Sequence, residues 1–176
     1  SEPVLEIAFT TPISAPWGSP AGSSVIHQPL IQADISYDGH SYKGIGYCKR
    51  YWFVEPPHFW SWRFINGAVD DGRYMIWTAD AQWGEDAEKY DYFRIAYPDG
   101  TVLAAENIDS YHRDNAAHGV IDGTAYEVQI DELCEWSGQV RHASMDTKLR
   151  QRFCKMRVIH DGEVDESYAL NETGMG

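Results

Sequence analysis

The chain has 176 residues, 43% of them hydrophobic, which is enough apolar material for one domain with a single core. Its formal net charge of −13 argues against binding to nucleic acid or to an anionic membrane surface, because long-range repulsion opposes both approaches. The binding partners expected for such a chain are therefore neutral or apolar molecules. No stretch approaches the ~18 consecutive apolar residues that crossing a bilayer requires, so membrane insertion is not expected.

The first strand-like segment covers residues 4–10. The Pro-, Gly- and Ser-rich residues 11–24 follow it, so we expect the N-terminal 24 residues to form a partly irregular arm. Asp-Gly pairs then recur along the chain, and this dipeptide supplies the positive φ of a tight hairpin turn. The pairs begin at Asp38, Asp71, Asp99, Asp122 and Asp161.

Strand-like residues flank these pairs, which predicts a series of hairpins. The further strands are predicted at residues 32–37, 40–44, 59–65, 74–81, 92–97, 101–104, 126–130, 136–143, 153–160 and 163–170. Residues 106–119 form the longest polar connection and predict a lid, and residues 146–151 predict one turn of helix. The chain is therefore predicted to be all-β.

Short strands joined by hairpins must hide their sheet edges, either in two stacked sheets or in a closed barrel. The sequence contains 7 Trp, 11 Tyr and 6 Phe, so its interior would be bulky and partly polar. We expect one antiparallel β-barrel domain over residues 1–176, with about eight to ten strands and a central hydrophobic cavity.

Several motifs follow one another in a fixed order. They are Gly44-Ile-Gly46-Tyr47, Trp52, Trp60-Ser-Trp62, Pro98-Asp99-Gly100 and Glu172-Thr173-Gly174. In this order the sequence resembles the lipocalin-like family of carotenoid 1,2-hydratases, AttH-type proteins and fungal Diels–Alderase or cyclase enzymes. The match runs from about Asp38 to the C-terminus, as though the chain were the second of the family's two β-domains.

The sequence departs from the family at an acidic position, which falls on Lys49, and at neighbouring positions, which fall on Arg50, Tyr51 and Phe53. The resemblance therefore implies the fold and the ligand class but no specific reaction. It implies a cofactor-independent cyclase or isomerase of terpenoid or polyketide biosynthesis, which folds a hydrophobic substrate and promotes cyclisation, isomerisation or hydration. The alternative is a carrier that binds a hydrophobic small molecule without chemistry.

The candidate catalytic residues lie on and just after the strand that the family resemblance implies at Gly44-Ile-Gly46-Tyr47. Side chains alternate along a strand, so Tyr47, Lys49 and Tyr51 share a face, where they could polarise a carbonyl or transfer a proton. A lysine exposed to solvent is the alternative. His58 follows in a Pro-Pro turn, where it is either a proton-transfer group or simply solvated.

The candidate substrate-binding residues are aromatic, with one arginine. Tryptophans could form a flat apolar wall, or they could be ordinary core residues, and Arg63 could anchor a carbonyl or carboxylate. Strand parity prevents Trp52 and Lys49 from both pointing inward unless a bulge intervenes. The set is Trp52, Trp60, Trp62, Arg63 and Trp77.

No nucleotide-binding fingerprint is present, and the three cysteines form no CxxC pair, so no cofactor, metal site or disulfide is predicted. A reducing cytoplasm is the expected location. A single domain of this kind could also form a homodimer that covers its open end.

Overall fold

The computed structural model describes residues 4–12, 17–18, 24–52, 60–69, 72–83, 90–111, 116–142 and 145–175, and every regular element in these ranges is a β-strand. The all-β prediction is confirmed. The chain divides into two compact units, one of residues 1–53 with 96–101 and the other of residues 54–95 with 102–176. A single barrel domain over residues 1–176 stays a prediction. The described residues contain no helix with the length and apolar character of a membrane span.

The first unit is built on a four-stranded antiparallel sheet around a long central strand. Its strands are β1 (Leu5–Pro12), β2 (Trp17–Gly18), β3 (Ser24–Tyr37) and β4 (His40–Trp52), and β3 pairs with the other three. Asp38 and Gly39, with φ of 47° and 77°, form the predicted two-residue turn between β3 and β4. β1 and β2 occupy part of the predicted irregular arm, and the rest of that arm lies outside the described residues.

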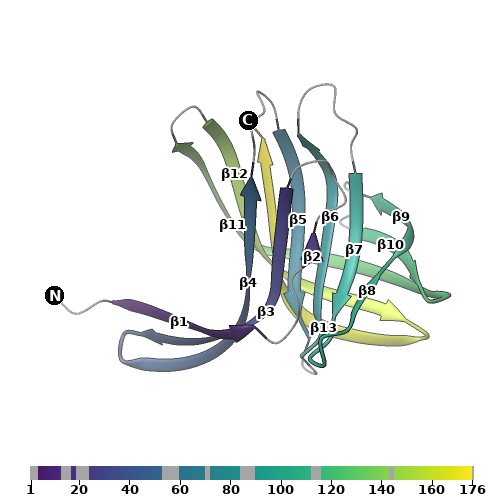
Figure 1. Ribbon diagram of the computed structural model, residues 1–176, viewed down its shortest axis with the longest axis horizontal. Coiled ribbons are helices and arrows are strands. Elements are labelled where there is room, and N and C mark those ends of the chain that lie inside the picture. Colours follow the sequence, from purple (N-terminus) through teal and green to yellow (C-terminus); the bar gives the residue numbers. More distant parts are fainter. Residues whose placement is uncertain are drawn as a thin grey trace. The chain divides into compact units, whose positions relative to one another are not determined.

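The second unit carries a nine-stranded sheet that is strongly curled (Figure 1). The spatial order of the strands is β8-β7-β6-β5-β13-β12-β11-β10-β9. In chain order they are β5 (Trp60–Ala68), β6 (Tyr74–Trp83), β7 (Tyr90–Ala96), β8 (Val102–Ala104), β9 (Glu106–Tyr111), β10 (Ala116–Ile121), β11 (Thr124–His142), β12 (Met145–His160) and β13 (Glu163–Met175).

The two outermost strands of this sheet, β8 and β9, are separated in sequence only by Ala105. The amide of Ala105 donates a 2.9 Å hydrogen bond to the carbonyl oxygen of Phe93 on β7. Gly119 on β10 lies against the same point, because a Cβ there would be 2.9 Å from the Cβ of Ala105. The sheet therefore curls until its two edges meet at Ala105. This agrees with a lipocalin-like fold, while a complete barrel with a central cavity stays a prediction.

One face of the curled sheet, here called the inner face, carries the buried core. Pairing places Val128 opposite Val158, Ile130 opposite Met156 and Cys154 opposite Ala169, and all six side chains are at most 4% exposed. Full burial of a side chain the size of valine or methionine is worth about 1.5–3 kcal/mol. These residues alternate along β11, β12 and β13, so the opposite, outer face of the same strands is the more exposed one.

Two predictions about connections were wrong. Residues 106–119 are largely taken up by the strands β9 and β10 instead of a lid, because the inward residues Ala117 and Gly119 of β10 are buried while its polar residue His118 faces outward. Residues 146–151 belong to β12 and not to a helical turn, because they pair with β11 and, from Lys148 onward, with β13. In both cases sheet pairing overrides the local sequence preference.

Candidate functional site

Polar side chains gather at one end of the inner face and form what we call the inner polar cluster. It consists of Arg63 on β5, Glu132 and Glu135 on β11, Arg152 and Cys154 on β12, and Asn171 on β13. Strand register brings these residues together, since Arg152 lies opposite both Glu135 and Asn171, and Glu132 lies opposite Cys154.

A bulge in β11 directs two carboxylates at the same arginine. Residues three apart on a regular strand point to opposite faces. The β11–β12 register shifts between Glu132 and Cys134, so the extra residue Leu133, which is 56% exposed, is absorbed there. Both glutamates consequently reach Arg152, whose Nε lies 3.3 Å from Glu132 Oε1 and 3.0 Å from Glu135 Oε2.

The paired charges are needed because Arg152 is only 7% exposed, and a buried guanidinium without a counter-charge is strongly unfavourable. Arg150 also donates a hydrogen bond to Glu135. The hydrogen bond from Arg150, followed by that from Arg152, holds the pKa of Glu135 below its usual range. Glu135 therefore stays ionised at neutral pH.

Arg63 and Asn171 form the buried part of the cluster nearest to β5. Arg63 is 8% exposed, and its Nε donates to Oδ1 of Asn171 at 3.4 Å. Asn171 has no exposed surface, and within the described part of the chain its Nδ2 has no hydrogen-bond acceptor. The cluster thus offers a neutral amide donor beside a guanidinium.

The Cys154 thiol is not suited to nucleophilic chemistry. Burial, reinforced by the charge of Glu132, raises its pKa to about 11, although Arg152, Arg63 and Asn171 act in the opposite direction. The thiol is therefore protonated at neutral pH, and the thiolate is the reactive form. Among the described residues no group of three His, Cys, Asp or Glu side chains is arranged to hold a metal ion.

A second polar group lies at the other end of the inner face, below the β12–β13 turn. Asp165 Oδ2 lies 2.7 Å from Arg73 Nη2 and 3.0 Å from His160 Nε2, and the Tyr126 ring stacks on His160 with centroids 4.9 Å apart. Burial alone would raise the pKa of Asp165, but the hydrogen bond with His160 and the charge of Arg73 outweigh it and hold the pKa low. Buried apolar side chains of the core lie between the two polar ends of this face.

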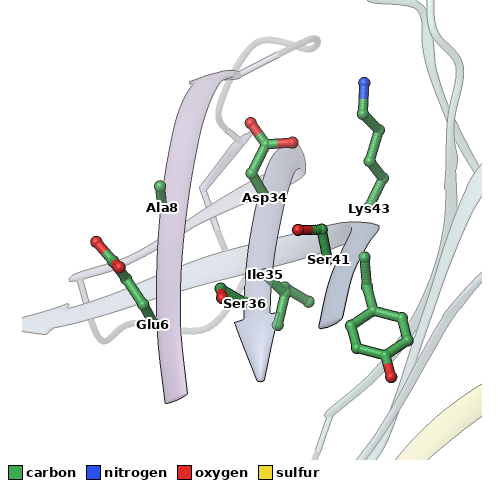
Figure 2. Close-up of a pocket in the computed structure, with 8 residues that line it drawn as sticks. Glu6, Ala8, Asp34, Ile35, Ser36, Ser41 and Lys43 are labelled. Atoms are coloured by element: carbon green, nitrogen blue, oxygen red, sulfur yellow. The ribbon is translucent and has the colours of Figure 1, made fainter. Parts of the chain in front are cut away.

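The first unit has a hollow of about 440 Å³ on the polar face of its sheet (Figure 2). Asp34 and Lys43 pair directly across β3 and β4, and Glu6 extends beside them from β1. These three residues are exposed, so the hollow is a surface feature that removes little of a ligand from water. The inner polar cluster is the better candidate, because its donors are buried next to apolar side chains.

The structure describes the side chains of three of the nine predicted site residues. Tyr47 is half-buried on β4, in the first unit. Trp62 and Arg63 are neighbours on β5 whose contacts go to the consecutive residues Glu172 and Asn171 of β13, so they lie on opposite faces of the sheet. The indole N–H of Trp62 donates to Glu172 Oε1 at 3.0 Å on the outer face, and Arg63 belongs to the inner polar cluster.

The other six predicted residues lie outside what the structure describes at the level of side chains. His58 falls outside the described ranges altogether, and for the rest only the strand is described. Those on β4 are Lys49, Tyr51 and Trp52, while Trp60 lies on β5 and Trp77 on β6. Their catalytic or binding roles stay predictions.

Sequence reasoning missed most of the inner polar cluster. Arg152 directly precedes a predicted strand in which Cys154, Met156 and Val158 alternate, and extending that alternation by one step would have placed Arg152 on the same face. Asn171 carries no comparable local signal. Its position follows from the β12–β13 register, which the sequence does not state.

The fold of this chain is similar to that of several solved structures. CghA, determined with Sch210972, matches with a TM-score of 0.53 and 9% identity over 96% of this chain and 60% of its own. Kievitone hydratase from Nectria haematococca matches at 0.49 and 11%, over 86% of this chain and 52% of its own. A Nitrosomonas europaea protein assigned to AttH matches at 0.47 and 16%, over 97% of this chain and 58% of its own.

The chain therefore spans between about half and three fifths of the length of these proteins. A scan against protein-family models and a search of curated protein sequences found no match. The match to CghA concerns the fold alone. At that level it confirms the resemblance to the lipocalin-like family of hydratases and cyclases.

Proposed function

We propose that the protein is a cofactor-independent enzyme of the cyclase, isomerase or hydratase type, which holds a hydrophobic small molecule against the inner face of its nine-stranded sheet. The observation that carries this proposal is the inner polar cluster, because buried donors beside an apolar surface are typical of small-molecule sites. The resemblance to a family of hydratases and cyclases supports the reaction class. A terpenoid or polyketide would supply a substrate of the required apolar character.

The proposed mechanism depends mainly on positioning. A flexible apolar chain held in a near-attack conformation reacts faster, because binding has already removed much of the entropy that the free chain would lose. Arg63 and Asn171 could then stabilise negative charge that develops on one substrate oxygen, since donors fixed in a buried site need no reorganisation during the reaction. Arg152 would act indirectly, as a charge held in place by Glu132 and Glu135.

A conversion assay tests the proposal. The protein is incubated with linear conjugated polyene ketones and prenylated phenols, and mass spectrometry detects an isomer of equal mass or a product that has gained one water. Removal of one stabilising donor typically costs about 10²- to 10³-fold in kcat, so Arg63→Met should lose turnover by that factor. Arg157→Met is the control, because Arg157 lies on the outer face of β12 and pairs with Asp131 at 3.4 Å.

The same assay separates the enzyme from a carrier. Loss of turnover with ligand affinity retained in Arg63→Met would support the enzyme, whereas ligand binding without conversion of any compound would support the carrier. Lys49→Met and Tyr51→Phe, made singly, examine the catalytic roles proposed for β4 in the same way. A homodimer and a cytoplasmic location stay predictions, and sedimentation of the isolated chain checks the first.

A further inference from the structure

The four-stranded sheet of the first unit has one face that is made of apolar and aromatic side chains, which we call the apolar face. Side chains alternate along a strand, so residues that pair across neighbouring strands point to the same side of the sheet. None of the residues on this face is Asp, Glu, Lys or Arg. They are Leu5, Ile7 and Phe9 on β1, Ile31, Ala33, Ile35 and Tyr37 on β3, and His40, Tyr42, Gly44 and Gly46 on β4.

The large side chains at one end of the apolar face are open to solvent. Five of them are between 45% and 62% exposed, namely Leu5, Ile7, Phe9, Tyr37 and Tyr42. Ile31 and Ala33, at the other end, are buried. A sheet with one apolar face normally packs that face against a second layer. The described residues supply no such layer over the exposed end.

The apolar face is level, because large side chains fill the space above its glycines. A Cβ at Gly46 would lie 3.2 Å from a ring atom of Phe9, and a Cβ at Gly44 would lie 3.5 Å from Cδ1 of Ile35. Small-molecule sites are usually concave. A level apolar face is instead suited to a flat partner such as another sheet, since two sheets pack face to face at a distance of about 10 Å.

The distribution of charge favours a second copy of the chain as this partner. Glu6, Asp34 and Lys43 all lie on the opposite face of the sheet, so an acidic or basic partner would find no counter-charge on the apolar face. Two copies repel each other at long range, because each has a formal net charge of −13. Stacking their apolar faces nevertheless brings no like charges together, and a two-fold axis matches each face with one of identical size.

The exposed area is of the size that a weak dimer needs. Complete burial of an aromatic side chain removes about 150–250 Å² from solvent, and Phe9, Tyr37 and Tyr42 are each more than half exposed. Together with Leu5 and Ile7 they expose roughly 400 Å² per copy, or about 800 Å² for two copies. The neighbouring side chains and backbone bring the total to about 1,000 Å², which is the lower limit for a specific interface.

We propose that the apolar face of the first unit is a dimer interface, on which a second copy of the chain stacks its own apolar face about a two-fold axis. This surface differs from the open barrel end that the sequence-based prediction of a homodimer invoked. The inference goes beyond the proposed function, because that function uses the inner face of the second unit. Dimerisation through the first unit requires neither a ligand nor turnover.

Sedimentation equilibrium of the wild-type chain measures the association, from about 1 μM to about 300 μM protein and at about 50 mM and about 500 mM NaCl. We expect a monomer–dimer equilibrium with a Kd in the micromolar range, as the small area implies. The dimer should become tighter at the higher salt concentration, because salt screens the repulsion between two acidic chains and leaves apolar contacts in place.

Matched variants on one strand locate the interface. Ile7→Glu places a carboxylate from each copy in the apolar contact, where like charges are strongly unfavourable, so the Kd should rise at least about 100-fold. Ala8→Glu adds the same charge at the next position, which is exposed on the polar face, and should change the Kd less than about threefold. Tyr42→Glu and its control Ser41→Glu repeat the comparison on β4. Circular dichroism checks that each variant is folded.

A measurement on the wild-type protein does not depend on the folding of any variant. In a mixture of ¹³C-labelled and unlabelled chains, an isotope-filtered NOE experiment should show contacts between copies at the methyl groups of Ile7 and Ile35. A chain that stays monomeric at about 300 μM at both salt concentrations would overturn the inference, and this result is expected if another kind of partner covers the face.

A dimer that is weakened equally by the apolar-face variants and their controls, or by neither, would also overturn the inference, because its interface would lie elsewhere. These outcomes are distinguishable from failure of the proposed function. Association is measured without substrate, and the substituted residues lie outside the inner polar cluster.

Discussion

Replacement of Gly174 by alanine should displace the Trp62 indole from the outer face of the sheet. A Cβ at position 174 would overlap the Cζ2 and Cη2 atoms of Trp62 and lie 2.7 Å from Cε2, whereas carbon atoms pack at about 3.5–4.0 Å. Both residues lie in paired strands, since Gly174 is directly opposite Trp62 in the β13–β5 register. The ring must therefore move, and with it goes the hydrogen bond to Glu172.

The size of the effect follows from what the indole loses. A hydrogen bond to a charged acceptor stabilises the folded state by about 1.5–3 kcal/mol, and its loss is partly offset because replacing glycine by alanine within a strand stabilises the fold by about 0.5–1 kcal/mol. We expect Gly174→Ala to lower the free energy of unfolding by about 1–2 kcal/mol. For a chain of this length that corresponds to a fall in Tm of roughly 2–8 °C.

Gly138→Ala is the matched comparison. A Cβ there would lie 2.6 Å from two ring atoms of Trp136, but Trp136 is 52% exposed and can turn into solvent. We expect a change within about 0.5 kcal/mol, as for most surface substitutions. Thermal and urea unfolding, followed by circular dichroism, measure both variants. Equal losses in the two would refute the reasoning, as would a Gly174→Ala loss that persists in a Trp62→Ala background.

Two further predictions concern titratable groups. Exposed Cys48 and Cys134 should react with a thiol reagent in the folded protein, while Cys154 should react only on unfolding. The reason is that the Cys154 pKa of about 11 leaves about 100-fold less thiolate at pH 8 than the ordinary pKa of 9.0 would. Fast modification of three thiols would contradict this. The pKa of Asp165 is lowered by folding, so its contribution to stability is complete above about pH 4 and disappears as pH falls through the folded-state pKa. The stability difference between the wild type and Asp165→Asn should therefore shrink from pH 7 to pH 3. A difference that stays constant over this range would show that ionised Asp165 does not stabilise the fold.

The hairpin turns could be predicted from the sequence because their cause is local. Asp122-Gly123 and Asp161-Gly162 have positive φ at both positions, as Asp38-Gly39 has, and each joins two paired strands. Alternation along a strand also puts the neighbours Trp62 and Arg63 on opposite faces, and this is what their contacts show. Turn chemistry and alternation act within a few residues, so one sequence suffices to read them.

The inner polar cluster could not be predicted in the same way because its cause is not local. Glu135 shares a face with Glu132 only because the bulge shifts the register of β11, and the local sequence pattern does not predict a bulge. Asn171 is buried among polar groups that strand pairing brings from β5 and β12. Its polar neighbours in space are at least 17 positions away in the sequence, Cys154 being the nearest.

The bulge at Leu133 also has an evolutionary consequence. Insertions and deletions are usually accepted in loops, because a change of length inside a strand reverses the orientation of every residue that follows. Here the bulge absorbs the extra residue locally. Without Leu133 the strand would be regular, and Glu132 and Glu135 would be two positions apart, so their side chains would still lie on the same face. Homologues should therefore differ by one residue within this 19-residue strand, and their alignments should allow a gap at this position.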